Sequence, residues 1–438
     1  MKSVSTLLVL LLCAGFGEAQ QQRKLTLEDA VELARQKNLA VIQARNNVEG
    51  RQSAVTAAYG SLLPTLDASA SYRSNTSWVT PFDGVTSKSY DAGLSGRIIL
   101  FDGFANFSNI SRSKSDASAA EYDVNRVEQT AIYQTHQLFL NVVRTAQLSN
   151  VAEDNLKRSQ RQLERISESN KVGAVALADV YRQRVQVGSD ELLLIQAQNN
   201  HEKSKQDCLA YIGVDFDSEY VFEFSEGTTT VDTLEFASVN ATYGNFNELV
   251  RTALTRRPDY RASADIVDGT DASVTIARSG HLPTVSATGS YGYSGFENAA
   301  GTSSLSDNRD LSVGVAVSLP IFSGFATQSR ISQAVVQQRN AQQQLRQSER
   351  QVTVDVRKAL LDLEAAEKQV RVTASSVVSA GIDRKIAEEK YALGASTLLD
   401  LLIANANYTT ALSNKVNAVI GYQLSKKGAE YALGTISK

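Results

Sequence analysis

The residue types that carry catalysis or metal chemistry are sparse in this chain. Its three histidines, His136, His201 and His281, are scattered, and Cys208 is the only cysteine beyond the N-terminal segment. This spacing matches no recognised set of metal ligands. No serine lies in a nucleophile elbow and no glycines form a phosphate-binding loop. We therefore expect no catalytic residue, no metal and no cofactor, that is, a protein that is not an enzyme.

Two aspartates are better placed for chemistry of another kind. Asp179 follows the short segment Val172-Gly173-Ala174, and Asp400 follows Leu393-Gly394-Ala395 just past Thr397. Glycine supplies the permissive backbone that a tight turn needs. Carboxylates just after such a turn lie near the positive end of the next helix dipole, so helix capping alone is sufficient to explain both.

Long helices must hold these turns. Residues 104–170 and 325–390 contain no proline and keep a helical pattern, which predicts rods of about 100 Å. Apolar residues every seven positions from Val356 to Val377 indicate a coiled-coil seam. The turns near 171–176 and 391–397 then lead into return helices over 176–211 and 397–431. Further helices are expected to begin at the caps Thr26 and Asn245 and to run to about 59 and 280.

The chain turns extended after Pro64 and Pro283, since proline disfavours helix in the preceding residue. Apolar and small polar residues then alternate, which predicts strand hairpins over 64–101 and 283–322, with loops over 74–88 and 294–309. A soluble sandwich also alternates, but strands of roughly ten residues match those that cross a bilayer. Gly103 and Gly324 are expected at the return from strand to helix.

The N-terminal residues resemble an export signal. Lys2, an apolar run and small residues up to Ala19 are typical of a cleavable signal peptide over 1–19. Lipidation of Cys13 is the alternative, although Leu12 is bulky where a small residue should precede the cysteine. No later stretch approaches the roughly 20 apolar residues of a membrane-spanning helix, so insertion must use strands.

These landmarks occur twice in the same order, as an internal sequence repeat. Leu63-Pro64 recurs as Leu282-Pro283, and Phe101-Asp102-Gly103-Phe104 recurs as Phe322-Ser323-Gly324-Phe325, roughly 220 residues later in each case. The chain is therefore divided into two repeats, 20–213 and 245–438, joined by an irregular linker over 214–244. Four strands cannot close a barrel, and an open edge in lipid is costly. Three subunits with twelve strands solve this problem.

The balance of charged residues argues against one class of binding partner. The chain has 44 Lys+Arg and 47 Asp+Glu, interspersed along its length, so nucleic acid is not expected as a partner. The fold class that follows is a mixed α/β membrane protein, in which a trimeric β-barrel is joined to long antiparallel helices.

These landmarks together resemble the outer membrane efflux family, the TolC-like exit ducts, over essentially the whole mature chain. The resemblance implies a homotrimer in the outer membrane of a Gram-negative-type cell, with a twelve-strand barrel and a periplasmic helical tunnel. It also implies a periplasmic adaptor and an inner-membrane pump of the RND, ABC or MFS type as partners. A structural or adhesive stalk is the alternative function. Small-molecule or metal efflux and protein secretion both stay open, because the pump selects the cargo.

Residue roles follow from the same resemblance. Asp400 matches a ring of aspartates that narrows the tunnel and selects cations, and three such carboxylates would repel and raise their pKa. Asp179 and Tyr391 match a pair that locks the closed tip. Ile403 stands where a second ring aspartate is expected, and Ser396 stands where an arginine is expected. The adaptor-docking grooves of the family map onto the two tip segments, at the residues Val172, Gly173, Ala174, Leu393, Gly394 and Ala395.

Overall fold

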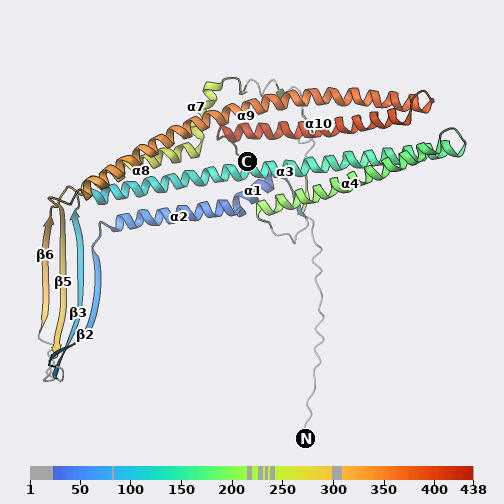
Figure 1. The fold of residues 1–438 in the computed structure, drawn as a ribbon. Helices are drawn as coiled ribbons and strands as arrows, with labels where there is room; N and C mark the ends of the chain where they lie inside the picture. The colour runs from blue at the N-terminus through green and yellow to red at the C-terminus, as the bar shows by residue number, and fades with distance from the viewer. Residues whose placement is uncertain are drawn as a thin grey trace, which may run out of the picture.

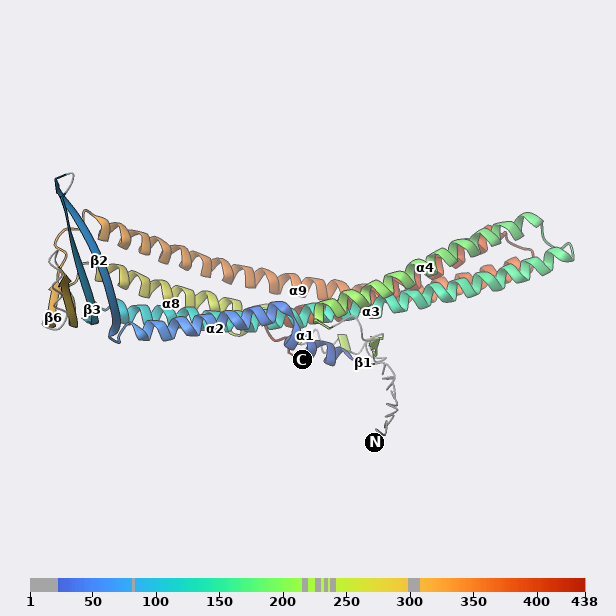
Figure 2. The same cartoon turned by 90° about the horizontal axis from the view of Figure 1, so that it is seen from below.

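The protein is elongated. The structure, a computed structural model, describes residues 23–80, 83–214, 220–224, 230–231, 235–236, 242–297 and 308–437. A sheet lies at one end of a long helical body, and two helical hairpins end together at the other (Figure 1 and Figure 2). The predicted signal segment 1–19, with Cys13, lies outside these residues. Among the described helices, none is both long enough and apolar enough to cross a membrane.

The sheet has four antiparallel strands in the order β2-β3-β5-β6. Their bounds are β2 Thr65–Thr80, β3 Asp83–Phe101, β5 Thr284–Glu297 and β6 Arg309–Ser318. Register puts Leu94 opposite Tyr291, and Tyr291 opposite Leu311, on one face. Ser290 and Ser312 pair on the other face. The predicted alternation thus gives one apolar and one polar face.

Two details of the predicted hairpins are wrong. The loop expected over 74–88 is largely strand, because the ladder continues through Thr76, whose hydroxyl lies 3.0 Å from that of Thr86. The strand expected to reach 322 ends at Ser318, two residues before Pro320, which lacks the N–H that a further ladder bond needs. Residues 298–307 of the second expected loop lie outside the described part of the chain.

The long helices match their predicted bounds to within two residues. They are α3 Ala105–Lys171 and α9 Ala326–Ala392, each of 67 residues, with return helices α4 Leu177–Ile212 and α10 Leu398–Ala432. Gly103 and Gly324 precede α3 and α9 with φ of 69° and 58°. Each is followed by a phenylalanine that is also left-handed, so the chain reverses sharply from strand to helix. Pro64 and Pro283 lie immediately before β2 and β5.

The single helices expected from Thr26 and Asn245 are wrong, because each is broken in two. The segments are α1 Leu27–Lys37, α2 Leu39–Gly60, α7 Phe246–Arg256 and α8 Pro258–Ser279. Asn38 adopts an extended backbone, and its side chain accepts the Ala40 N–H. Arg257 is likewise extended because Pro258 follows it and begins the next helix.

The main packed core lies where these breaks occur, near the middle of the molecule. Leu25, Phe139, Cys208 and Ile212 are fully or nearly fully buried in one cluster. The linker expected to be irregular contains strand β4 Tyr220–Phe222, which pairs in parallel with β1 Arg23–Leu25. The remaining buried residues form narrow seams between helices, including Val352, Val356, Leu363, Ala366 and Val370 along α9.

Candidate gate at the helical tips

Both helical hairpins turn through the same backbone motif. In the first, the N–H of Gly173 donates to Asn170 (2.9 Å) and the N–H of Ala174 donates to Ser169 (2.9 Å). In the second, Gly394 and Ala395 make the equivalent bonds. These paired bonds close a helix end when a left-handed residue follows it, and Gly173 and Gly394 have φ of 75° and 70°. Glycine is required here by backbone conformation.

The apex of each turn is open to solvent. A Cβ placed on Gly173 or Gly394 would meet no atom within 4 Å. Val172 and Leu393 are 80% and 83% exposed, far more than apolar residues in a packed loop. Each hairpin therefore presents one apolar side chain at its apex, and nothing within the described chain covers either side chain.

Asp400 closes a capping box at the start of α10. The Thr397 N–H and hydroxyl both donate to Asp400 Oδ2, at 3.0 and 2.7 Å, and the Asp400 N–H donates to Thr397 Oγ1 at 3.3 Å. The Thr397 bonds, helped by the charge of Lys390, hold the pKa of Asp400 below its usual value. In one chain Asp400 is thus an exposed, ionised cap. The pKa of Asp400 is thus lowered in the single chain, whereas repulsion between three Asp400 carboxylates in a trimer was expected to raise it.

Asp179 and Tyr391 lie at the interface between the two hairpins. The Tyr391 ring packs on a small cluster formed by Ile166, Val180 and Leu398. Its hydroxyl is enclosed and has no hydrogen-bond partner in the described part of the chain. Burial, and secondarily the charge of Asp179, raise the pKa of Tyr391. The structure therefore brings the two residues near each other.

Asp179 is engaged within its own helix. Its carboxylate accepts a hydrogen bond from Arg182 at 3.0 Å, and its side chain is 22% exposed. No bond between Asp179 and Tyr391 occurs among the described residues. The two side chains are thus neighbours without a direct bond in the single chain.

An ion pair that the sequence did not predict joins the hairpins directly. Arg165 of α3 donates to Glu388 of α9 at 2.7 Å. Beside it lies a cleft of about 750 Å³ that Tyr391, Ala174 and Gly394 also line. No local pattern points to this pair, because its members lie in different halves of the chain. They meet only when the hairpins pack side by side.

The two departures from the family pattern have different surroundings. Ser396, where an arginine is expected, is partly buried, and its Oγ has no partner within the described chain. Ile403, where a second ring aspartate is expected, is 51% exposed on α10. Ile403 is therefore exposed but uncharged, and Asp400 is the acidic residue in the first turn of α10.

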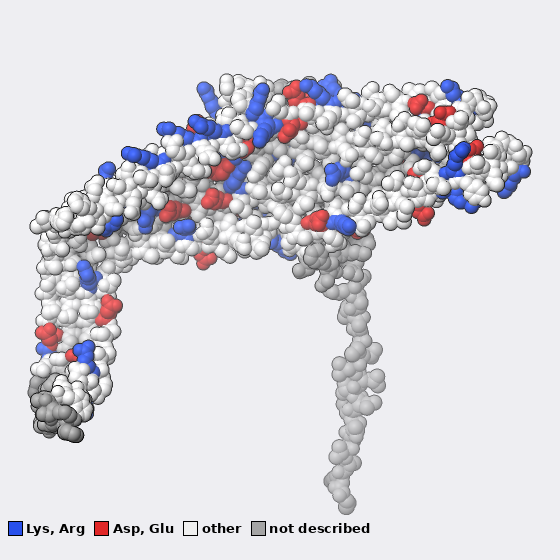
Figure 3. Space-filling view, viewed as in Figure 1, with Lys and Arg blue, Asp and Glu red and all other residues white. Residues whose placement is uncertain are grey.

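Charge elsewhere is mixed. In Figure 3, basic and acidic side chains are interspersed over the helical body, with no face of a single sign in this view. No group of three or more His, Cys, Asp or Glu residues in the described ranges is arranged to hold a metal ion.

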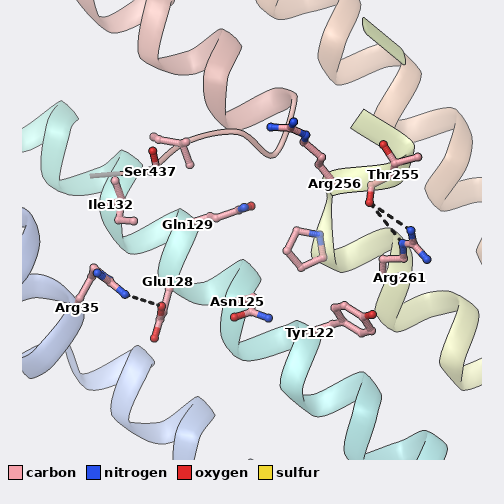
Figure 4. A pocket seen from close by; sticks show the side chains of 12 residues that line it. Arg35, Tyr122, Asn125, Glu128, Gln129, Ile132, Thr255, Arg256, Arg261 and Ser437 are labelled. Atoms are coloured by element: carbon pink, nitrogen blue, oxygen red, sulfur yellow. Dashed lines mark hydrogen bonds and ion pairs between the residues drawn. The ribbon is translucent and has the colours of Figure 1, made fainter. Parts of the chain in front are cut away.

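A second hollow, of about 530 Å³, lies near the middle of the molecule (Figure 4). Arg35 points to Glu128 across it at 3.5 Å, and Arg261 reaches the Thr255 carbonyl at 3.4 Å. Both polar contacts hold neighbouring helices together. We attribute this hollow to the way in which the helices pack at their breaks, and we assign it no ligand.

Comparison with known proteins identifies the family. A model described as "Outer membrane efflux protein" matches residues 30–214 and 249–433. The chain is 25% identical over 453 residues to outer membrane protein TolC of Escherichia coli (strain K12), covering 100% of this chain and 87% of that protein. It is 27% identical over 397 residues to TolC of Vibrio cholerae serotype O1, covering 88% of this chain and 85% of that protein.

Solved structures share the fold. The Campylobacter jejuni CmeC outer membrane channel has a TM-score of 0.77 at 21% identity, covering 93% of this chain and 85% of that chain. The outer membrane protein VceC of Vibrio cholerae has a TM-score of 0.75 at 18% identity, covering 93% and 96%. Because the family match spans most of the sequence, the chain belongs to the outer membrane efflux protein family and is an outer-membrane protein with a large periplasmic helical part.

Proposed function

We propose that this chain is the subunit of a homotrimeric exit duct, which passes substrates from an inner-membrane pump and a periplasmic adaptor to the outside. The duct serves tripartite efflux or type I secretion, and the chain itself catalyses no reaction. Each subunit contributes two tandem halves, 20–213 and 245–438, joined by the linker 214–244. The observation that carries this proposal is the four-stranded sheet.

The sheet has the properties of one third of a barrel. Its outer strands β2 and β6 each pair on one side only among the described residues. The apolar face is open, with Leu311 and Val313 72% and 82% exposed. An unpaired edge in lipid costs several kcal/mol for each unsatisfied backbone group. Pairing β6 of one copy with β2 of the next removes every free edge, and three copies give an even-numbered barrel of a usual size.

The helical hairpins support the same assembly. Apolar side chains point outward from α4 and α9, among them Val185, Leu192 and Val372, which are 74%, 62% and 65% exposed. Exposed apolar rows on helices of this length favour burial against further helices. Three copies supply the missing neighbours and extend the barrel as a helical tunnel.

The tips form the gate in this proposal. Asp400 of each copy faces the lumen, and the three carboxylates attract cations, while Ile403 keeps the ring single. Asp179 and Tyr391 hold the two hairpins together in the closed state. The apolar apices at Val172 and Leu393, with the glycines beside them, receive the adaptor.

Single-channel conductance of the purified trimer in a planar bilayer tests the proposal. Asp400→Asn removes the charge but keeps an oxygen for Thr397, whereas the matched control Thr397→Ala removes the capping side chain and keeps the charge. We expect Asp400→Asn to reduce cation preference and block by multivalent cations, and Thr397→Ala to leave both closer to wild type. Equal effects of the two variants, or no effect of either, contradict the gate.

The duct itself needs a separate test, because a closed tip also gives no current. Tyr391→Ala combined with Asp179→Asn removes the ring that packs on Ile166, Val180 and Leu398 between the hairpins, so this double variant is expected to open more often than wild type. Absence of conductance from trimeric, inserted double variant contradicts the duct and favours a stalk.

A further inference from the structure

Four arginines meet in one cleft between the two helical hairpins, below the tips. Arg158, Arg161 and Arg165 lie on one face of α3, since their spacing of three and four residues is that of neighbours on a helix. Arg384 faces them from α9. The cleft has a volume of about 270 Å³, and its remaining lining residues are Gln162, Glu388, Leu401 and Asn405.

Positive charge in this cleft exceeds negative charge. Arg165 and Arg384 both contact Glu388, at 2.7 and 3.4 Å. Glu388 is the one carboxylate in the lining, which lies wholly within the described helices. The Arg161 Nε donates to the Lys157 carbonyl at 3.2 Å. Two of the four guanidinium groups thus share Glu388, and the carboxylate that acts on Arg158 is Asp154, which lies outside the lining.

Arg158 finds only neutral acceptors. It donates to Asn155 Oδ1 and to Thr409 Oγ1, each at 3.3 Å. Burial, and next the nearby charge of Arg384, lower the pKa of Arg158. An anion bound near Arg158 would therefore stabilise its charged guanidinium group.

Tyr408 of α10 holds two of these cations close together. The guanidinium carbons of Arg158 and Arg384 lie 5.6 and 5.1 Å from the centre of its ring, within the range of a cation–π contact. The Nε of Arg384 is enclosed and donates to no acceptor in the described part of the chain. The cluster is thus pre-organised, with donor capacity that its own residues do not use.

We propose that this cleft binds a small multivalent oxyanion of the phosphate class, bridging α3 of the first hairpin to α9 of the second. Guanidinium groups bind such oxyanions through paired N–H bonds. The ligand would supply the negative charge that Glu388 alone does not. This binding does not depend on the duct proposal, since all the residues concerned belong to one chain.

The bound anion has a structural consequence. It contacts both hairpins a few helical turns from the tips, so it favours the arrangement in which they lie side by side. Within the duct proposal, that arrangement is the closed tip. Loss of the anion would leave the guanidinium groups to repel one another across the interface.

Equilibrium dialysis of the full-length, detergent-purified protein against labelled inorganic phosphate, in chloride buffer of low ionic strength, tests the site. We expect saturable binding that Arg158→Gln and Arg384→Gln each weaken about tenfold or more, since each removes a charge-assisted hydrogen bond. The matched control is Arg346→Gln, which alters an exposed arginine farther along α9 and should leave the affinity unchanged. Absence of saturable binding, or equal loss in all three variants, overturns the proposal.

A second measurement uses the wild-type protein and so avoids any folding defect of the variants. Hydrogen exchange with and without phosphate should show added protection over 155–165 and 381–388, and little change over 330–346. Unchanged exchange in the first two segments at saturating phosphate also overturns the proposal. Both experiments are independent of conductance, so their failure is distinguishable from failure of the duct.

Discussion

Replacing Arg257 is expected to loosen the joint at which five helices meet. Its side chain is 4% exposed at the break between α7 and α8. It bonds to Asp259 at 2.6 Å, to Asp355 of α9 at 2.9 Å and to the Ala432 carbonyl of α10 at 3.5 Å. Arg126 of α3 lies 3.8 Å from the same Asp259. One guanidinium therefore links elements from distant parts of the sequence.

The size of the expected destabilisation depends on how deeply the carboxylates of Asp259 and Asp355 are buried. Removing one member of a buried ion pair costs about 3–5 kcal/mol because the other is left without compensation. The carboxylates of Asp259 and Asp355 are 32% and 31% exposed, so water reaches them and the lower end applies. For Arg257→Met we expect about 3 kcal/mol, which corresponds to roughly a hundredfold increase in local opening.

Hydrogen exchange of the detergent-purified protein measures this opening directly. The increase should appear in residues 253–262, in the part of α9 near Asp355 and at the end of α10. The matched control is Arg251→Met, because Arg251 is exposed on α7 and its side chain makes no hydrogen bond or ion pair among the described residues. If Arg257→Met exchanges no faster than the control in these segments, the guanidinium is not the link that we describe.

Three further predictions concern stability and reactivity. Gly213→Ala should lower the melting temperature clearly more than Gly173→Ala. Both residues have positive φ, which costs about 1–2 kcal/mol for alanine, but only at Gly213 would the new Cβ lie 2.7 Å from the Lys37 carbonyl oxygen; equal shifts would contradict the clash. Burial raises the pKa of the Cys208 thiol to about 12, so a thiol reagent at pH 8 should label it only after unfolding, and rapid labelling of folded protein would refute this. Burial lowers the pKa of His136 to about 4 from 6.5, so the unfolded state binds the proton first. Stability should therefore fall, by at most about 3 kcal/mol, as pH drops from about 6.5 towards 4; melting curves of His136→Leu should lack this component.

Short-range patterns in the sequence predicted the regular elements well. The alternation in residues 66–72 and 311–319 indicated strands with one apolar face, and the register confirms that face. The glycine turns placed the ends of α3 and α9 within two residues. Such features depend on backbone preferences and side-chain periodicity, which neighbouring residues decide.

The predicted elements differ from the structure where a local signal interrupts a longer periodic pattern. Asn38 and Pro258 are both strong helix-start signals, and a new helix begins at each, although the helical periodicity continues across them. Strands β2 and β3 are longer than predicted, and the loop between them is shorter, because Ser, Thr and Asn residues, typical of loops, pair across the two strands. Composition alone does not separate a polar strand from a loop.

At the tips, the sequence by itself located Asp400, Asp179 and the glycine turns, because each follows a recognisable helix end. Only the tertiary structure joined Arg165 to Glu388 and gathered four arginines into one cleft. Those contacts join residues more than 200 positions apart, and they depend on how two separately formed hairpins lie against each other. Helix propensity and capping are local and readable in sequence, whereas the charge balance of an interface exists only after packing has brought both sides together.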